Sequence, residues 1–272
     1  MAKLYASLLQ RRLAAFGATD GVRAPLQAGS RDGLSTVHNL FVLRHMTVRH
    51  SCAWPDGVPR PPGDGPLWVC QVDFEKAFDR VPRELLWLRL EERGIHGDML
   101  AALKASYAKV LMKVKVNGRV GPAFLSRQGV KQGCPASPCL FGFFVEVVAD
   151  YLDSTDKHES PVVSEREWCP GVPSGEGWRR VPQMFYAYDL TLFATHGARL
   201  HRGLWVLSVF CDAFGMRVNV KKCEVLLFGE GKLNAWAGVR CQECEGLQPE
   251  NTMVCCVMVA RGDGTRSACL LL

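Results

Sequence analysis

Apolar residues near the start of the chain recur every three or four positions, which predicts a helix over residues 4–16. The recurring residues are Leu4, Leu8, Leu9 and Leu13. A similar spacing after Ser35, a residue type that caps helices, predicts a second helix to about residue 48. Residues 55–66 are dense in proline and glycine and predict an exposed loop or linker. The mostly apolar segment Leu67–Asp73 is typical of a buried strand.

The rest of the pattern mixes helices with short strands. Helices are expected over residues 83–93, 98–108, 137–152 and 198–214, the last ending at Gly215. Hairpins are expected over 110–124, with Asn117-Gly118 as its turn, and over 184–194. Residues 153–182 are predicted to form a long polar loop, and 216–220 and 224–228 two short strands. This order of elements indicates an α+β fold.

Residues 230–272 lack a sustained period and end in three leucines. We expect either a loosely folded, disordered tail or the product of a shifted reading frame. Cys241-x-x-Cys244 with Cys255-Cys256 has some likeness to a zinc knuckle. Adjacent cysteines form an awkward second ligand pair and no histidine follows His201, which argues against zinc.

Composition limits the class of protein. With 272 residues, 48% of them hydrophobic, the chain can form one large domain or two small lobes. No apolar run reaches the roughly 18 residues that a membrane helix needs. The first helix carries Lys3, Arg11 and Arg12 and lacks an apolar signal core. We therefore expect an intracellular protein, nuclear or cytoplasmic and not secreted, whose twelve cysteines are free thiols.

The net charge of +6 is unevenly distributed. Residues 101–135 contain no acid, and their basic residues are Lys104, Lys109, Lys113, Lys115, Arg119, Arg127 and Lys131. Such a stretch suits the phosphates of a nucleic acid. Solvated faces of ordinary helices and strands are the alternative.

Two aspartates stand where carboxylates can converge. Asp73 ends the buried strand, and Asp189 lies at the turn of a second apolar strand pair. Converging carboxylates hold the divalent ions used in nucleotidyl transfer. Each aspartate, taken alone, is better explained as a turn or helix-cap residue, so the prediction depends on their combination.

Five segments resemble, in order, the motifs of reverse transcriptases from LINE-type (non-LTR) retrotransposons, with group II intron enzymes as more distant relatives. They are Gln27–Thr36 (fingers motif), Asp73–Asp79 (motif A), Gly129–Pro138 (motif B), Tyr186–Asp189 (motif C) and Gly215–Cys223 (motif D). The resemblance covers about residues 3–229 and begins inside the fingers. It implies a truncated domain: partial fingers over 1–66, a palm over 67–229 and no recognisable thumb. The palm would be an antiparallel sheet packed on helices.

The resemblance also implies an activity: RNA-directed DNA polymerisation with two Mg²⁺ ions. The partners would be an RNA template, a DNA primer and deoxynucleoside triphosphates, with no membrane involved. The implied catalytic residues are Asp73, Asp189 and Lys222; the implied metal ligands are Asp73, the carbonyl of Phe74, and Asp189. Nucleotide contacts would come from Phe78, as a steric gate against ribose, and from Gln132 and Gly133. Nucleic-acid contacts would come from Arg31, Lys113, Lys115, Arg119 and Lys131.

Some of these assignments have ordinary alternatives. Phe78 can equally be a core residue. Lys222 can be a solvated or phosphate-contacting lysine rather than a proton donor.

Tyr188 departs from the family pattern, because motif C has an aspartate at this position. A phenol is neutral at physiological pH, binds magnesium poorly and is much larger than a carboxylate. The altered motif, Tyr-Ala-Tyr-Asp, therefore predicts a weak or inactive polymerase. The alternatives are a catalytically dead nucleic-acid-binding remnant and a relic that folds poorly.

Overall fold

A computed structural model describes residues 2–19, 21–24, 27–51, 66–155, 160–164, 178–228, 257–261 and 266–270. Its helices are α1 (Ala2–Gly17), α2 (Thr36–Ser51), α3 (Ala77–Arg80), α4 (Arg83–Glu92), α5 (Gly97–Tyr107), α6 (Ser137–Thr155), α8 (Gly197–Phe214) and the 3₁₀ turn η1 (Val220–Lys222). Its strands are β1 (Leu67–Val72), β2 (Leu111–Val116), β3 (Arg119–Leu125), β4 (Val162–Ser164), β5 (Trp178–Arg180), β6 (Gln183–Tyr186), β7 (Asp189–Ala194), β8 (Glu224–Phe228), β9 (Val257–Arg261) and β10 (Arg266–Leu270).

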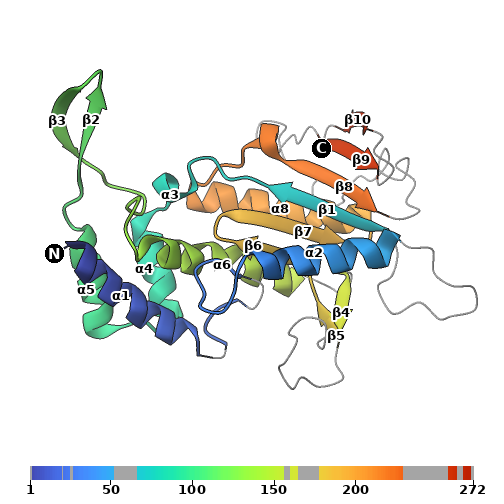
Figure 1. Ribbon diagram of the computed structural model, residues 1–272, viewed down its shortest axis with the longest axis horizontal. Coiled ribbons are helices and arrows are strands. Elements are labelled where there is room, and N and C mark those ends of the chain that lie inside the picture. Colours follow the sequence, from blue (N-terminus) through green and yellow to red (C-terminus); the bar gives the residue numbers. More distant parts are fainter. Residues whose placement is uncertain are drawn as a thin grey trace, which may run out of the picture.

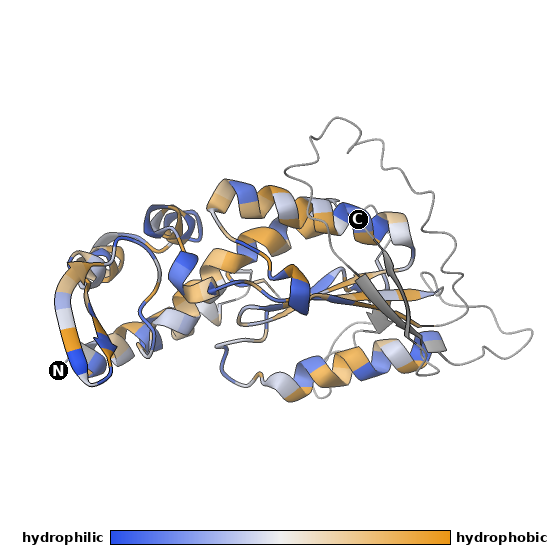
Figure 2. Cartoon of the chain, turned by 90° about the horizontal axis from the view of Figure 1, so that it is seen from above, coloured by the Kyte–Doolittle hydropathy of each residue, from blue (hydrophilic) through white to orange (hydrophobic). Residues whose placement is uncertain are grey.

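The main sheet has the strand order β10-β9-β8-β1-β7-β6 (Figure 1). β1 lies inside this sheet and pairs antiparallel with β7 and β8. Helices cover both faces: Figure 2 shows α2 on one side and α6 and α8 on the other. The prediction of an α+β fold, an antiparallel sheet packed on helices, is thereby confirmed.

Helix α6 forms the centre of the larger core. Most of its residues are apolar, as in helices surrounded by protein, and nearly every residue from Ser137 to Ala149 is buried, including Glu146. A smaller core lies on the opposite face of the sheet, where Val42 and Met46 of α2 contact Leu67 and Val69 of β1. Side chains of β1 alternate between the two faces, and because both faces are covered every residue of the strand except Gln71 is apolar and buried.

The hairpin β2–β3 projects away from the rest of the molecule (Figure 1). Its turn consists of Asn117 (φ 48°) and Gly118 (φ 78°), and a two-residue turn of this kind needs positive φ at both positions. Side chains on both of its faces are largely exposed.

The structure differs from the sequence predictions around Asp73. Residues 216–220 were expected to form a strand, but only a single bridge, between Val218 and Phe74, is present. Two backbone hydrogen bonds form this bridge, from Asn219 N to Asp73 O (2.7 Å) and from Glu75 N to Arg217 O (2.8 Å), and the chain then turns into η1. The short helix α3 was not predicted.

Two further segments are more ordered than expected. The range 153–182 is not one loop, since α6 continues to Thr155 and β4 pairs with β5. Within 230–272, β9 and β10 join the main sheet, with β9 parallel to β8. The expectation of a tail outside the domain is wrong for these two strands. Cys241, Cys244, Cys255 and Cys256 lie outside the described residues.

The helices that the structure describes include none with the length and hydrophobicity required to cross a membrane.

Candidate active site

Two carboxylates meet at one end of the main sheet. β1 pairs with β7 through Val72 and Leu190, and continuing this antiparallel register by one residue places Asp73 beside Asp189. Partial burial raises the pKa of the Asp189 carboxyl, and the negative charge of Asp73 raises it further. The fold therefore brings together two acids that are far apart in the sequence.

Lys222 lies against this pair. Its Nζ is 3.4 Å from Oδ2 of Asp73. The segment before it is fixed by backbone hydrogen bonds, from Asn219 N to Asp73 O (2.7 Å) and from Glu75 N to Arg217 O (2.8 Å). Because the lysine side chain is 67% exposed, the ion pair itself contributes little to stability. The ion pair is informative because it places the Lys222 ammonium group next to Asp73.

An open cleft of about 610 Å³ adjoins Asp73. The residues that line it include Asp73, Phe74, Phe78, Gln132, Tyr188 and Lys222. The Phe78 ring stacks on Phe141 at 5.0 Å, and the Tyr188 ring meets Phe78 edge-on at 6.0 Å. Phe78 is therefore half core and half cleft wall, and the ring of Tyr188, 39% exposed, lies in the cleft next to it.

The loop before α6 forms another wall. The Val130 N–H donates to Phe78 O (2.8 Å), and Gln132 Nε2 donates to Asp79 Oδ1 (2.9 Å). Gly129, with φ of 82°, lies so close to this segment that a Cβ would be 2.8 Å from Asp79 O. Only glycine fits there, and the close approach fixes Gln132 beside the cleft. Gly133 lines a different pocket, together with residues of α1 and α5.

Arg83 is an organising residue that the sequence analysis missed. Its guanidinium donates to three backbone carbonyls of the same loop: Ser126 O (2.8 Å), Gln128 O (3.0 Å) and Gly129 O (2.9 Å). A lone arginine at the start of a helix carries no local signal for these contacts, because the three loop carbonyls are more than forty residues away.

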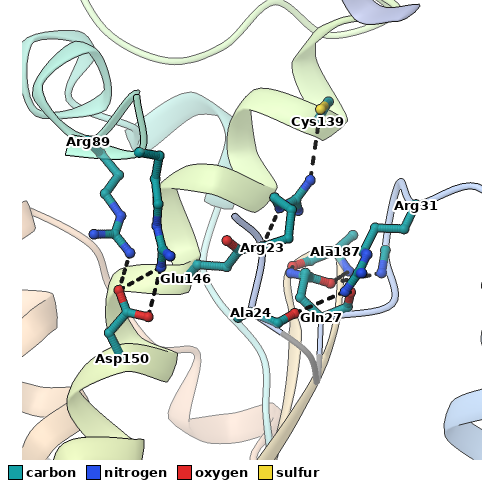
Figure 3. A network of polar contacts seen from close by, with 11 residues as sticks. Arg23, Ala24, Gln27, Arg31, Arg89, Cys139, Glu146, Asp150 and Ala187 are labelled. Atoms are coloured by element: carbon teal, nitrogen blue, oxygen red, sulfur yellow. Dashed lines mark hydrogen bonds and ion pairs between the residues drawn. The ribbon is translucent and has the colours of Figure 1, made fainter. Parts of the chain in front are cut away.

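Two of the predicted nucleic-acid contacts are engaged within the protein. Arg31 Nη1 donates to Ala24 O (3.1 Å) and Gln27 O (3.4 Å), as Figure 3 shows. Lys131 Nζ donates to Ser106 O (2.5 Å) and lies over the Tyr107 ring. The assignment of Arg31 and Lys131 to nucleic-acid contacts stays a prediction. Lys113, Lys115 and Arg119 are exposed on the hairpin β2–β3.

Residues 2–252 match the family described as reverse transcriptase (RNA-dependent DNA polymerase). The chain belongs to this family. Among curated proteins, this reverse transcriptase chain is 29% identical to the transposon TX1 uncharacterized 149 kDa protein of Xenopus laevis, over 62% of the chain and 12% of that protein. It is 26% identical to a retrovirus-related Pol polyprotein from the type-1 retrotransposable element R2 of Popillia japonica, over 57% of the chain and 23% of that protein.

Solved structures of telomerase share the fold. A Candida tropicalis telomerase truncated from its C-terminal domain matches with a TM-score of 0.52 and 14% identity, over 85% of this chain and 41% of that one. A Candida albicans telomerase in complex with a fragment of telomeric RNA matches with a TM-score of 0.51 and 12% identity, over 84% of this chain and 34% of that one. The reverse transcriptase chain spans less than half the length of each of these relatives and neighbours.

The described part of the site offers two carboxylates as metal ligands, Asp73 and Asp189. Among the residues that the structure describes, no group of three or more His, Cys, Asp or Glu side chains could hold a metal. Asp73 and Asp189 remain, and two carboxylates completed by water and phosphate oxygens suit Mg²⁺. The set of three carboxylates that the resemblance implies is one short, at Tyr188.

Replacing Asp189 by asparagine should stabilise the free protein at neutral pH. The pKa of Asp189 is raised in the folded state, so its ionised form opposes folding above that pKa, and the opposition vanishes as the pH falls below the unfolded value. We expect Asp189→Asn to increase the free energy of unfolding by about 0.5 kcal/mol or less, because the site is partly solvated. Urea denaturation at neutral and acidic pH measures this difference; a variant less stable than the wild type at neutral pH would contradict it.

Proposed function

We propose that this chain is the RNA-directed DNA polymerase domain of a non-LTR retrotransposon, with its activity reduced by Tyr188. The observation that carries the proposal is the placement of Asp73 and Asp189 at adjoining strand ends, beside a cleft lined by Phe78 and Gln132. In this proposal residues 1–66 are partial fingers and 67–229 the palm. The template is RNA, and the substrates are a DNA primer and deoxynucleoside triphosphates.

Each side chain has a task in this scheme. Asp73, the carbonyl of Phe74, and Asp189 would hold Mg²⁺, which when bound neutralises phosphate charge and lowers the pKa of the attacking primer hydroxyl. Phe78 would lie under the incoming sugar and exclude a 2′-hydroxyl. Gln132 and Gly133 would contact the nascent base pair, and Lys222 would protonate the leaving pyrophosphate.

The ring of Tyr188 works against this chemistry. It replaces an anionic oxygen ligand by a neutral phenol, which magnesium binds poorly. It also occupies part of the cleft, in edge-on contact with Phe78. The residual activity would depend on two carboxylates alone.

The exposed hairpin β2–β3 is the proposed phosphate contact. Replacing Lys113, Lys115 and Arg119 together by glutamine should weaken binding to an RNA–DNA hybrid and reduce the slope of log K against log salt by about two to three. Fluorescence anisotropy at several salt concentrations measures the slope. Lys104→Gln is the control, because this exposed lysine pairs with Glu91 (3.0 Å). An unchanged slope in the triple variant would exclude the hairpin as a phosphate contact.

Primer extension on an RNA template tests the function itself. We expect slow incorporation of deoxynucleotides by the purified chain, and none by Asp73→Ala. The second candidate, a catalytically dead nucleic-acid-binding remnant, is favoured by the missing third carboxylate. That second function would be established if the chain bound the hybrid in a salt-sensitive way and neither the wild type nor Tyr188→Asp incorporated deoxynucleotides.

A further inference from the structure

A buried glutamine contacts the turn that carries Tyr188 and Asp189. Gln27 is 0% exposed. Its Oε1 accepts from the N–H groups of Gly29 (2.8 Å) and Ala187 (3.3 Å), and its Nε2 donates to Ala187 O (3.3 Å). One side chain thus pairs both backbone groups of Ala187, across 160 positions of sequence, and Figure 3 shows the two residues side by side.

The turn needs such a partner. Only Ala187 and Tyr188 separate the paired residues Tyr186 and Asp189. Ala187 has φ of 56°, in the left-handed region that costs a residue with a Cβ on the order of 1 kcal/mol. An unsupported Ala187 would relax toward negative φ, and its neighbours Tyr188 and Asp189 would move with it.

The segment that carries Gln27 is itself fixed against the hairpin β6–β7. Phe185 O accepts from Ala28 N (3.0 Å) and from Asn39 Nδ2 (3.0 Å). Gly29 packs directly on the turn, since a Cβ there would be 2.1 Å from Ala187 N. Arg31 closes the same segment on itself through Ala24 O and Gln27 O. The glutamine amide is therefore presented by a rigid loop, not by a free surface chain.

We infer that Gln27 is a positioning residue, which holds Ala187 in its left-handed conformation and thereby keeps Asp189 beside Asp73. Its effect on the turn is independent of any reaction. Its effect on catalysis rests on the function proposed above.

Amide hydrogen exchange, resolved to single residues, tests the effect on the turn. Gln27→Met preserves volume and removes all three hydrogen bonds, so we expect the Ala187 N–H to exchange about tenfold faster. The matched control is Gln183→Met. Gln183 is also 0% exposed and lies at the other end of β6, where it donates to Asp153 (3.0 Å). The control should leave Ala187 protected, and equal acceleration in both variants would overturn the inference.

Gln27→Glu tests the acceptor of the side-chain amide separately from its donor. It is also the second variant to use if Gln27→Met fails to fold. The introduced carboxylate keeps the acceptor for Gly29 and Ala187 but loses the donor to Ala187 O. We expect Ala187 N–H to remain protected in this variant. Gln27 does not hold the turn if the Ala187 N–H exchanges as fast in Gln27→Glu as in Gln27→Met. The same conclusion follows if Gln27→Met leaves this exchange rate unchanged.

Catalysis is tested in the Tyr188→Asp background. Adding Gln27→Met should lower kcat about tenfold and leave the KM for deoxynucleotide unchanged, because the cleft wall of Phe78 and Gln132 is untouched. Adding Gln183→Met should change neither constant. If Gln27→Met accelerates exchange at Ala187 but no variant has polymerase activity, Gln27 holds the turn and the proposed function is wrong. If Gln27→Met in the Tyr188→Asp background leaves Ala187 unprotected but keeps full activity, the proposed function stands and Gln27 has no positioning role in catalysis.

Discussion

Tyr188→Asp is expected to increase RNA-templated DNA synthesis about a thousandfold, which corresponds to roughly 4 kcal/mol of transition-state stabilisation. The substitution supplies a third anionic oxygen next to Asp189 and Asp73. It also removes a ring from the cleft. Primer extension with purified protein, under single-turnover conditions, measures the gain.

Two controls separate the added ligand from the emptied space. Tyr188→Ala opens the cleft without adding a carboxylate and should give little gain. Asp73→Ala in the Tyr188→Asp background should abolish the restored activity. Folding should be little affected, because Tyr188 is partly exposed and an aromatic contact such as that with Phe78 contributes about 1 kcal/mol. Equal rates for Tyr188→Asp and Tyr188→Ala would refute the ligand explanation.

Arg23→Met is expected to lower the free energy of unfolding by about 3–5 kcal/mol, because it leaves a carboxylate buried without its partner. Arg23 and Glu146 are both almost completely buried, with Nε 2.5 Å from Oε1 (Figure 3). Burial raises the pKa of Glu146, and the charge of Arg23 opposes that shift. Arg23 also stacks over the ring of Phe143 at 4.4 Å and so fixes the N-terminal segment on α6.

Urea denaturation of single and double variants measures this loss. The double variant Arg23→Met with Glu146→Leu should recover most of it, since an apolar pair of similar size has no charge to desolvate. For comparison, Lys104→Met breaks an exposed pair with Glu91 and should cost about 1 kcal/mol or less. If Arg23→Met costs no more than Lys104→Met, the buried pair contributes nothing specific to the fold.

Local signals predicted much of the architecture. Asn117-Gly118 indicated the hairpin β2–β3, and Gly215, with φ of 65°, ends α8 as expected. The mostly apolar sequence of β1 predicted a buried strand. These features depend on conformational preferences of neighbouring residues, which a single sequence displays directly.

Features that depend on distant partners escaped prediction. Nothing near Gln27 or Arg83 in the sequence reveals that their side chains pair with backbone groups of Ala187 and Gly129. Nor does anything in the sequence indicate that protein carbonyls accept hydrogen bonds from Arg31 and Lys131. The parallel pairing of β9 with β8 likewise joins segments far apart in the chain. The roles assigned to Asp73, Asp189 and Lys222 stay predictions until activity is measured.

The residues that stabilise the fold and the residues proposed for catalysis lie in different parts of this molecule. The large buried side chains surround α6 and the interior of the sheet, whereas Asp189 and Tyr188 stand at an exposed strand end and turn. A substitution at that turn can silence the reaction while the scaffold keeps its shape. A genetic lesion of this kind would go unnoticed by the quality control that removes unfolded chains, so a silenced copy could persist and be reactivated by one reversal.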